Sequence, residues 1–236
     1  MTLRPRKRLY KEVGVASADG MTVVTLDGRP LRSPAKSILR LPNESLGLAI
    51  AKEWRDQEDE VRPQCMPLTR IAVTAIDRVS PERDGIIARV SAYGETDLLC
   101  YRSENADLSA RQAEKWQPLL DWVDETLSAP LGITTDIMPA AQDRNSLVAL
   151  RDAVATHNDL ELAALHLATT ITGSLVLALA LSHGRLDAQS AWELSHLDET
   201  WQAEHWGDDA EAVQRAERLC LDLHAVERLF ELSRLS

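Results

Sequence analysis

The hydrophobic pattern of the chain changes near residue 42. Between residues 9 and 41, short β-branched runs alternate with polar positions, and Asp-Gly pairs at 19–20 and 27–28 separate them. Asp-Gly pairs favour tight two-residue turns between antiparallel strands. The pattern predicts a β-meander whose last strand, around Pro30, is irregular or lies at an edge, because proline cannot donate a hydrogen bond to a neighbouring strand.

Beyond this point, apolar residues recur every three or four positions, which is typical of amphipathic helices. Asn43 is expected to cap the first helix, Ser80 the second and Asp107 the third. The predicted helices cover residues 44–58, 80–93, 107–127, 144–157, 160–182, 188–206 and 208–233, and a short apolar strand is predicted over 96–101. Strand and helix signals are thus separated along the chain, which predicts an α+β fold. We expect a small N-terminal β-rich domain over residues 1–64 and a larger all-helical domain over residues 65–236.

Composition narrows the classes of function. The 236 residues are 44% hydrophobic, enough for a substantial core, and 37 acidic against 26 basic side chains give a net charge of −11. This charge argues against a nucleic-acid partner, since clustered basic residues are needed to bind phosphates. The stretch from Leu162 to Ser182 is uncharged, but its His, Thr, Ser and Gly residues favour a buried core helix over membrane insertion. Three isolated cysteines predict no disulfide framework and suit a reducing compartment.

The sequence carries little sign of catalytic chemistry. Its ten glycines form no phosphate-binding loop, and no Gly-x-Ser-x-Gly elbow is present. Glu193 and His196 have the Glu-x-x-His spacing of di-iron helix bundles, but that site needs a second such pair, which the other histidines do not supply. We therefore expect no cofactor, no metal and no catalytic residue. The enzyme alternative is a helical metal-dependent hydrolase that uses Glu193, His196 and Glu199.

The predicted helix 188–206 is the most informative segment. At about 100° per residue, Leu194, Leu197 and Trp201 form one stripe, and a second, roughly opposite stripe contains Glu199. On that second stripe, Trp192 lies seven residues before the glutamate and Trp206 seven residues after it. One interpretation is a contact surface on which a partner's Arg or Lys would pair with this carboxylate. The other is a helix that is buried on both faces, with the carboxylate hydrogen-bonded internally.

The same region is strongly acidic. From Asp187 to Glu217 there are nine acidic residues and one basic residue, Arg215. Such a run is commonly a solvated helix face, but it can also guide a basic partner through faster, salt-sensitive encounter. A general protein-binding module with an acidic surface is therefore a third possibility, beside the contact surface above and the hydrolase.

Eight short motifs, in order and with their spacing intact, resemble the Atp12 family of assembly chaperones for the catalytic head of the F-type ATP synthase. They span most of the chain. A single motif is weak evidence for the family, but the ordered series is specific to it. The motifs are Leu9–Lys11, Leu26–Leu31, Glu53–Gln57, Met66–Thr69, Thr74–Asp77, Thr96–Arg102, Gln112–Trp122 and Leu197–Gly207. Within the third motif, Trp54 continues the apolar stripe of its predicted helix, so we expect it in the core.

The resemblance implies a non-enzymatic chaperone. Family members hold the unassembled α subunit of the ATP synthase head and prevent its aggregation until the β subunit replaces the chaperone. The acidic residue associated with activity in the family matches Glu199, with Asp198 beside it, and Trp192, Gln202 and Trp206 are expected to complete the partner-binding surface. Mitochondrial members carry a long presequence, whereas this chain starts almost at the first motif, so we expect a bacterial cytoplasmic member.

Overall fold

A computed structural model describes residues 6–206 and 210–235, and for residues 6, 205, 206 and 210–215 it describes the backbone alone. The chain forms two compact units. Unit 1 comprises Met1–Arg83, Asp159–Ala164 and Arg228–Ser236, and unit 2 comprises Asp84–Asn158 and Leu165–Glu227. A small N-terminal antiparallel sheet is followed by a mostly helical region, so the predicted α+β class is confirmed. The domain boundary at residue 64 stays a prediction.

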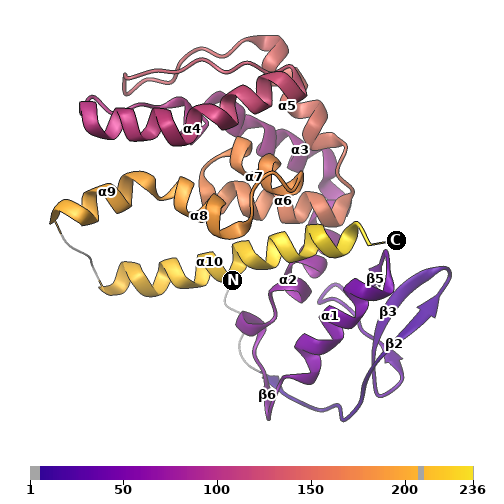
Figure 1. The fold of residues 1–236 in the computed structure, drawn as a ribbon. Coiled ribbons are helices and arrows are strands. Elements are labelled where there is room, and N and C mark those ends of the chain that lie inside the picture. Colours follow the sequence, from indigo (N-terminus) through magenta and orange to yellow (C-terminus); the bar gives the residue numbers. More distant parts are fainter. Residues whose placement is uncertain (1–5, 207–209, 236) are drawn as a thin grey trace. The chain divides into compact units, whose positions relative to one another are not determined.

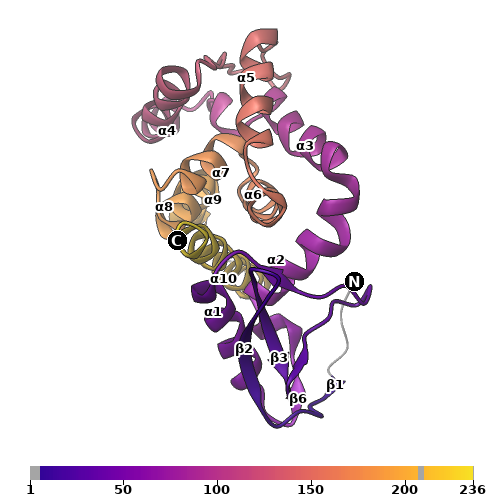
Figure 2. The same cartoon turned by 90° about the vertical axis from the view of Figure 1, so that its right-hand side faces the viewer.

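Strands β1 (Arg6–Lys7) and β6 (Glu60–Val61) of unit 1 form a two-stranded sheet, and its four-stranded sheet is built around one hairpin (Figure 2). Strand β2 (Val13–Ala18) pairs with β3 (Met21–Leu26), and β3 also pairs with the two-residue strands β4 (Arg29–Pro30) and β5 (Arg40–Leu41). Both Asp-Gly pairs occupy turns with positive φ, at 53° and 74° for Asp19 and Gly20 and at 47° and 75° for Asp27 and Gly28. These left-handed conformations are those of hairpin turns, so both predicted turns are confirmed.

Helix α1 (Glu44–Arg55) packs against β2 and β3. Asn43 caps it as predicted, because its side-chain oxygen accepts a hydrogen bond from the backbone N–H of Leu46 at 3.0 Å. Gly47 is the point of closest approach to the sheet, since a Cβ there would lie 2.5 Å from Cγ2 of Thr22. Leu46 and Ile50 are fully buried in this interface, which makes it the core of unit 1.

Trp54 is an exception to the predicted core of this helix. Its side chain is only partly buried, and its ring meets the ring of Tyr10 edge to face at a centroid distance of 5.6 Å. The Tyr10 hydroxyl in turn donates to the carbonyl of Trp54 at 2.7 Å. The predicted core position is therefore confirmed only in part: the indole packs against Tyr10 and its N–H is buried, but the residue as a whole keeps some exposure.

From Pro67 to Ser91 the chain is helical without a capped break. Helix α2 (Pro67–Thr74) continues through a π-turn (Ala75–Val79) and a 3-10 turn (Ser80–Glu82) into α3 (Arg83–Ser91). Ser80 has helical dihedrals of −56° and −44°, so its predicted role as an N-cap is wrong. The widened π-turn precedes Pro81, whose ring and missing N–H do not fit a regular helix interior.

Unit 2 has a helical core around α7 (Leu175–Ser182), all eight residues of which are buried. The predicted helix 160–182 divides into α6 (Asp159–Thr172) and α7, because Gly173 has a φ of 67° and Ser174 caps the second helix. The buried carboxylate of Asp97 accepts from the Ser174 hydroxyl at 2.7 Å and from the N–H of Val176 at 3.0 Å. Asp97 also caps a 3-10 turn at Leu98–Cys100, so the strand predicted over 96–101 is wrong.

Helices α4, α5 and α10 follow the sequence pattern closely. Helix α4 is capped by Asn105 instead of the predicted Asp107, which lies in its first turn. The bounds are Ala106–Leu127 for α4, Arg144–Ala155 for α5 and Ala210–Ser233 for α10. Within the described parts of the chain, no helix has the length and apolar character required to cross a membrane.

Candidate functional site

The predicted helix 188–206 is broken at His196. Figure 1 shows the two helices that result, labelled α8 and α9. Helix α8 (Ala188–Ser195) ends where His196 leaves helical geometry, with φ −112° and ψ 22°, and α9 (Leu197–Trp206) begins directly after it. The imidazole of His196 stacks on the indole of Trp192 at a centroid distance of 3.6 Å, and the Ser195 hydroxyl donates to the Trp192 carbonyl at 2.9 Å. These side chains compete with the regular backbone hydrogen bonds of a helix.

Helix α4 holds both halves of this broken helix. The amide of Gln112 donates to Asp198 at 2.8 Å, and the indole N–H of Trp116 donates to the Leu194 carbonyl at 3.0 Å. Leu194 lies in the last turn of α8, where carbonyls lack a partner within the helix. The spacing of Gln112 and Trp116 puts both side chains on one face of α4, so the motif that contains them is explained by internal packing.

Asp198 is an internal anchor. It is partly buried, and besides its bond from Gln112 it lies close enough to the Arg102 guanidinium to act on it electrostatically. Burial lowers the pKa of Arg102, while Cys100 and Asp198 act in the opposite direction. Arg102 is 9% exposed, and its guanidinium carbon lies 5.4 Å from the ring centroid of Trp116. A carboxylate in this position balances a buried positive charge.

Glu199 has the opposite environment. Its side chain is exposed, and among the described residues it makes no hydrogen bond or ion pair. Gln202, one turn further along α9, is also exposed, whereas Trp192 is partly buried under its stack with His196. The side chain of Trp206 lies outside the described residues. The structure therefore separates the acidic pair: Asp198 faces the protein interior and Glu199 faces solvent.

The residues of the hydrolase alternative form no metal centre. Glu193 is exposed and accepts from the side chain of Gln189 at 2.7 Å, and His196 stacks on an indole. In the described ranges, no three His, Cys, Asp or Glu residues are grouped so that they could hold a metal ion. The buried Cys100 thiol is not a nucleophile either, because burial raises its pKa to about 12.

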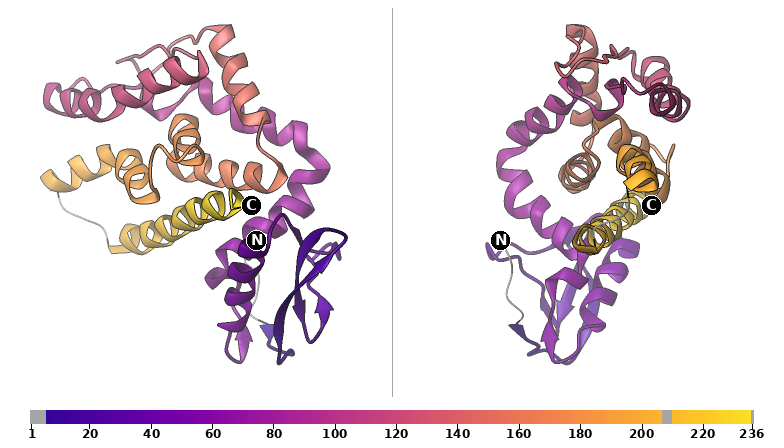
Figure 3. Two further views of the ribbon diagram at one scale, coloured as in Figure 1. Left: turned by 45° about the vertical axis from the view of Figure 1, so that its right-hand side comes forward. Right: turned by 90° about the vertical axis from the view of Figure 1, so that its left-hand side faces the viewer.

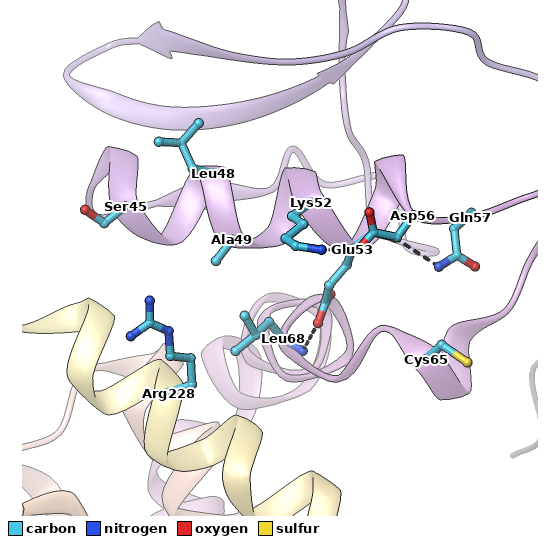
Figure 4. A pocket seen from close by; sticks show the side chains of 10 residues that line it. All are labelled: Ser45, Leu48, Ala49, Lys52, Glu53, Asp56, Gln57, Cys65, Leu68 and Arg228. Carbon is cyan, nitrogen blue, oxygen red and sulfur yellow. Dashed lines mark hydrogen bonds and ion pairs between the residues drawn. The ribbon is translucent and has the colours of Figure 1, made fainter.

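A groove of about 710 Å³ lies in unit 1 between α1, α2 and the last turns of α10 (Figure 4). Two of its polar side chains, Glu53 and Gln57, are engaged within the protein. The carboxylate of Glu53 accepts from the N–H groups of Leu68 and Thr69 at 2.7 and 2.8 Å, which caps α2, and Gln57 accepts from the N–H of Arg62 at 2.7 Å. The Glu53–Gln57 motif therefore serves to join α1 to α2. The residues that line the groove are Ser45, Leu48, Ala49, Lys52, Glu53, Asp56, Gln57, Cys65, Leu68 and Arg228.

Comparison with known proteins agrees with this arrangement. Residues 7–124 match the family model described as ATP12 chaperone protein. The crystal structure of Atp12 from Paracoccus denitrificans is 44% identical and superimposes with a TM-score of 0.92 over 97% of this chain and 98% of that one. The chain belongs to the ATP12 chaperone family. A chaperone candidate from Agrobacterium tumefaciens is 38% identical, with a TM-score of 0.92 over 96% of this chain and 86% of that one. The mitochondrial protein atp12 of Schizosaccharomyces pombe is 27% identical over 88% of this chain and 76% of that protein.

Membership of the ATP12 family decides between the interpretations left open above. The family consists of chaperones and not of enzymes, and the metal-dependent hydrolase is not supported. The role of the chain is that of an ATP synthase assembly chaperone, as the eight sequence motifs imply.

Proposed function

We propose that the chain holds the unassembled α subunit of the F-type ATP synthase head and keeps it from aggregating until the β subunit takes its place. Family membership supports an ATP synthase client. An unassembled subunit exposes an apolar interface that would otherwise associate with itself. The chaperone must cover that interface and still release it.

The carboxylate of Glu199 is the proposed contact on the chaperone side. This exposed group follows directly after Asp198, which is fixed by Gln112. A carboxylate on a well-anchored helix loses little freedom when it binds, and it offers one oriented negative charge to a client's Arg or Lys. The proposed surface also includes Trp192, Gln202 and Trp206. Asp198 helps to hold α9 in place through its hydrogen bond from Gln112.

Electrostatic contact also accounts for reversibility. A charge pair at the rim of an interface speeds encounter and is screened by salt, so it helps capture without making release slow. The acidic stretch around Glu199 adds to this field through the exposed Glu193, whereas the charge of Glu204 is paired with Arg111 at 3.0 Å. We further propose a bacterial cytoplasmic location, which agrees with the free cysteines at positions 65, 100 and 220.

Co-purification tests the client and the contact together. The parent chain carries an affinity tag and is mixed with isolated α subunit, and the retained client is measured at low and moderate salt. Glu199→Lys is expected to retain little client, whereas the control Glu125→Lys, an equal charge reversal at an exposed position of α4, retains as much as the parent. Failure of the parent to retain the α subunit would contradict the proposed client, and equal retention by Glu199→Lys would remove Glu199 from the surface.

A further inference from the structure

The loop between α4 and α5, residues 128–143, exposes two adjacent large apolar side chains. Ile137 is 99% exposed and Met138 is 73% exposed, and Ile133 nearby is 42% exposed. Single apolar residues are common on protein surfaces, but neighbouring ones at the tip of a loop are typical of contact sites. Methionine is well suited to this use, because its flexible side chain adapts to irregular apolar surfaces.

Hydrogen bonds hold the base of this loop in a defined conformation. The side chain of Gln142 accepts from the N–H of Gly132 at 2.8 Å and donates to its carbonyl at 3.0 Å. Thr134 donates its N–H to the Cys100 carbonyl and accepts from the N–H of Arg102, both at 2.8 Å. The apolar tip is therefore presented by an ordered base, so less freedom is lost when a partner covers it.

The same hydrogen bonds bring the loop to the end of α4 that carries the candidate site. Helix α4 is 22 residues long, about 33 Å, and the loop leaves its C-terminal end. Thr134 nevertheless pairs with the segment that precedes the N-terminus of α4, so the loop runs back along the helix, as Figures 1 and 3 show. Gln112, near that N-terminal end, holds Asp198, the neighbour of Glu199.

We propose that Ile137 and Met138 form a second, apolar contact with the client subunit, beside the charged contact at Glu199. This inference rests on the proposed function. The surface that these two side chains contact is an apolar patch with a basic rim on the unassembled ATP synthase subunit. The exposed acidic side chains of α8 and α9, such as Glu193 and Glu199, complement such a rim. They disfavour a second copy of this chain, which also carries a net charge of −11, and they disfavour an anionic lipid surface.

The two contacts respond differently to salt, which makes them separable. A charged contact weakens as ionic strength rises, whereas an apolar contact is not screened. The double variant Ile137→Ser/Met138→Ser is compared with the parent, with Glu199→Lys and with Leu221→Ser. Leu221 is a matched control, because it is 66% exposed on α10. All substituted side chains are exposed, so the far-ultraviolet circular dichroism spectrum is expected to stay that of the parent.

Affinity for isolated α subunit is measured by fluorescence anisotropy at low and high salt. The double variant is expected to bind about tenfold more weakly than the parent at both salt concentrations, a change of about 1.4 kcal/mol. Glu199→Lys should lose affinity chiefly at low salt, and Leu221→Ser should bind as the parent does. Parent-like affinity of the double variant would overturn this inference while leaving the proposed function intact, and lack of binding by the parent would overturn both.

Two further measurements test whether the loop tip binds a second copy of this chain or a lipid surface in place of the client subunit. If sedimentation shows that the parent self-associates and the double variant does not, the loop tip binds a second copy and the inference is wrong. If the parent binds anionic phospholipid vesicles and the double variant does not, the occupant is a lipid surface and the inference is equally wrong. The expected result is a chain whose self-association and vesicle binding do not depend on Ile137 and Met138.

Discussion

The two acidic residues at the start of α9 should have opposite effects on stability, although they are neighbours in the sequence. Asp198→Ala removes a hydrogen bond to a charged acceptor, 2.8 Å from the amide of Gln112, and takes a negative charge away from the buried Arg102. Gln112 is 2% exposed, so its amide would lose its partner in a dry environment. Glu199→Ala removes a solvated side chain without a partner among the described residues.

The expected magnitudes follow from these environments. A hydrogen bond to a charged group contributes about 1.5–3 kcal/mol, and leaving a buried group unpaired adds to the loss. We expect Asp198→Ala to lower the free energy of unfolding by about 2–3 kcal/mol and Glu199→Ala to change it by about 0.5 kcal/mol or less. Asp198→Asn keeps an acceptor oxygen for Gln112 but loses the charge, so its loss should lie between the two.

Urea unfolding followed by tryptophan fluorescence measures this difference. With a slope of about 2 kcal/mol per molar urea, the midpoint of Asp198→Ala should fall by about 1 M, and that of Glu199→Ala should stay within about 0.3 M of the parent. Equal midpoints for the two alanine variants would refute the assignment of Asp198 as the internal anchor and of Glu199 as the free surface group.

Three further outcomes are expected. Trp54→Ala should destabilise by about 2 kcal/mol instead of the 3–5 kcal/mol typical of a fully buried tryptophan, since its indole is only partly buried; an unchanged urea midpoint would contradict this. In the native protein, Cys65 should react with a thiol reagent much faster than Cys100, which is buried and has a pKa of about 12; mass spectrometry of early labelling measures the order, and earlier labelling of Cys100 would contradict the prediction. Burial raises the pKa of Glu53 above its ordinary value, so between the pKa of the unfolded chain and that of the folded state the folded protein keeps a proton that the unfolded chain releases, and stability should fall as the pH rises through this window. Glu53→Gln should lose this fall, and an equal pH dependence in both proteins would count against it.

Local chemistry made part of the fold predictable. The Asp-Gly turns at 19–20 and 27–28 and the cap at Asn43 depend on residues within a few positions, and the structure has all of them. The break between α6 and α7 also had a local signal, because Gly173 suits a left-handed helix end and Ser174 suits an N-cap, but the continuous uncharged run favoured one long helix. Only the further bond from the Ser174 hydroxyl to Asp97, 77 residues earlier, lacks such a signal.

The candidate site was predictable to a similar extent. Helical periodicity singled out Glu199, and the structure leaves its side chain exposed. The same arithmetic assumed an unbroken helix, however, whereas the structure interrupts the helix at His196, between Trp192 and Glu199. The sequence could not show that Asp198, unlike Glu199, is held internally, because its hydrogen-bond partner Gln112 lies 86 residues earlier in the chain. The loop tip at Ile137 and Met138 also lacked a sequence signal, since exposure cannot be read from two apolar residues in a loop.

Light scattering of isolated α subunit at the temperature at which it aggregates tests the central claim most directly. The parent chain at equimolar concentration is expected to suppress the rise in scattering, Glu125→Lys to suppress it equally, and Glu199→Lys to leave it close to that of the α subunit alone. Scattering that is unchanged by the parent, or suppressed as well by Glu199→Lys as by the parent, would contradict the proposal that this chain guards an unassembled subunit through the exposed carboxylate of α9.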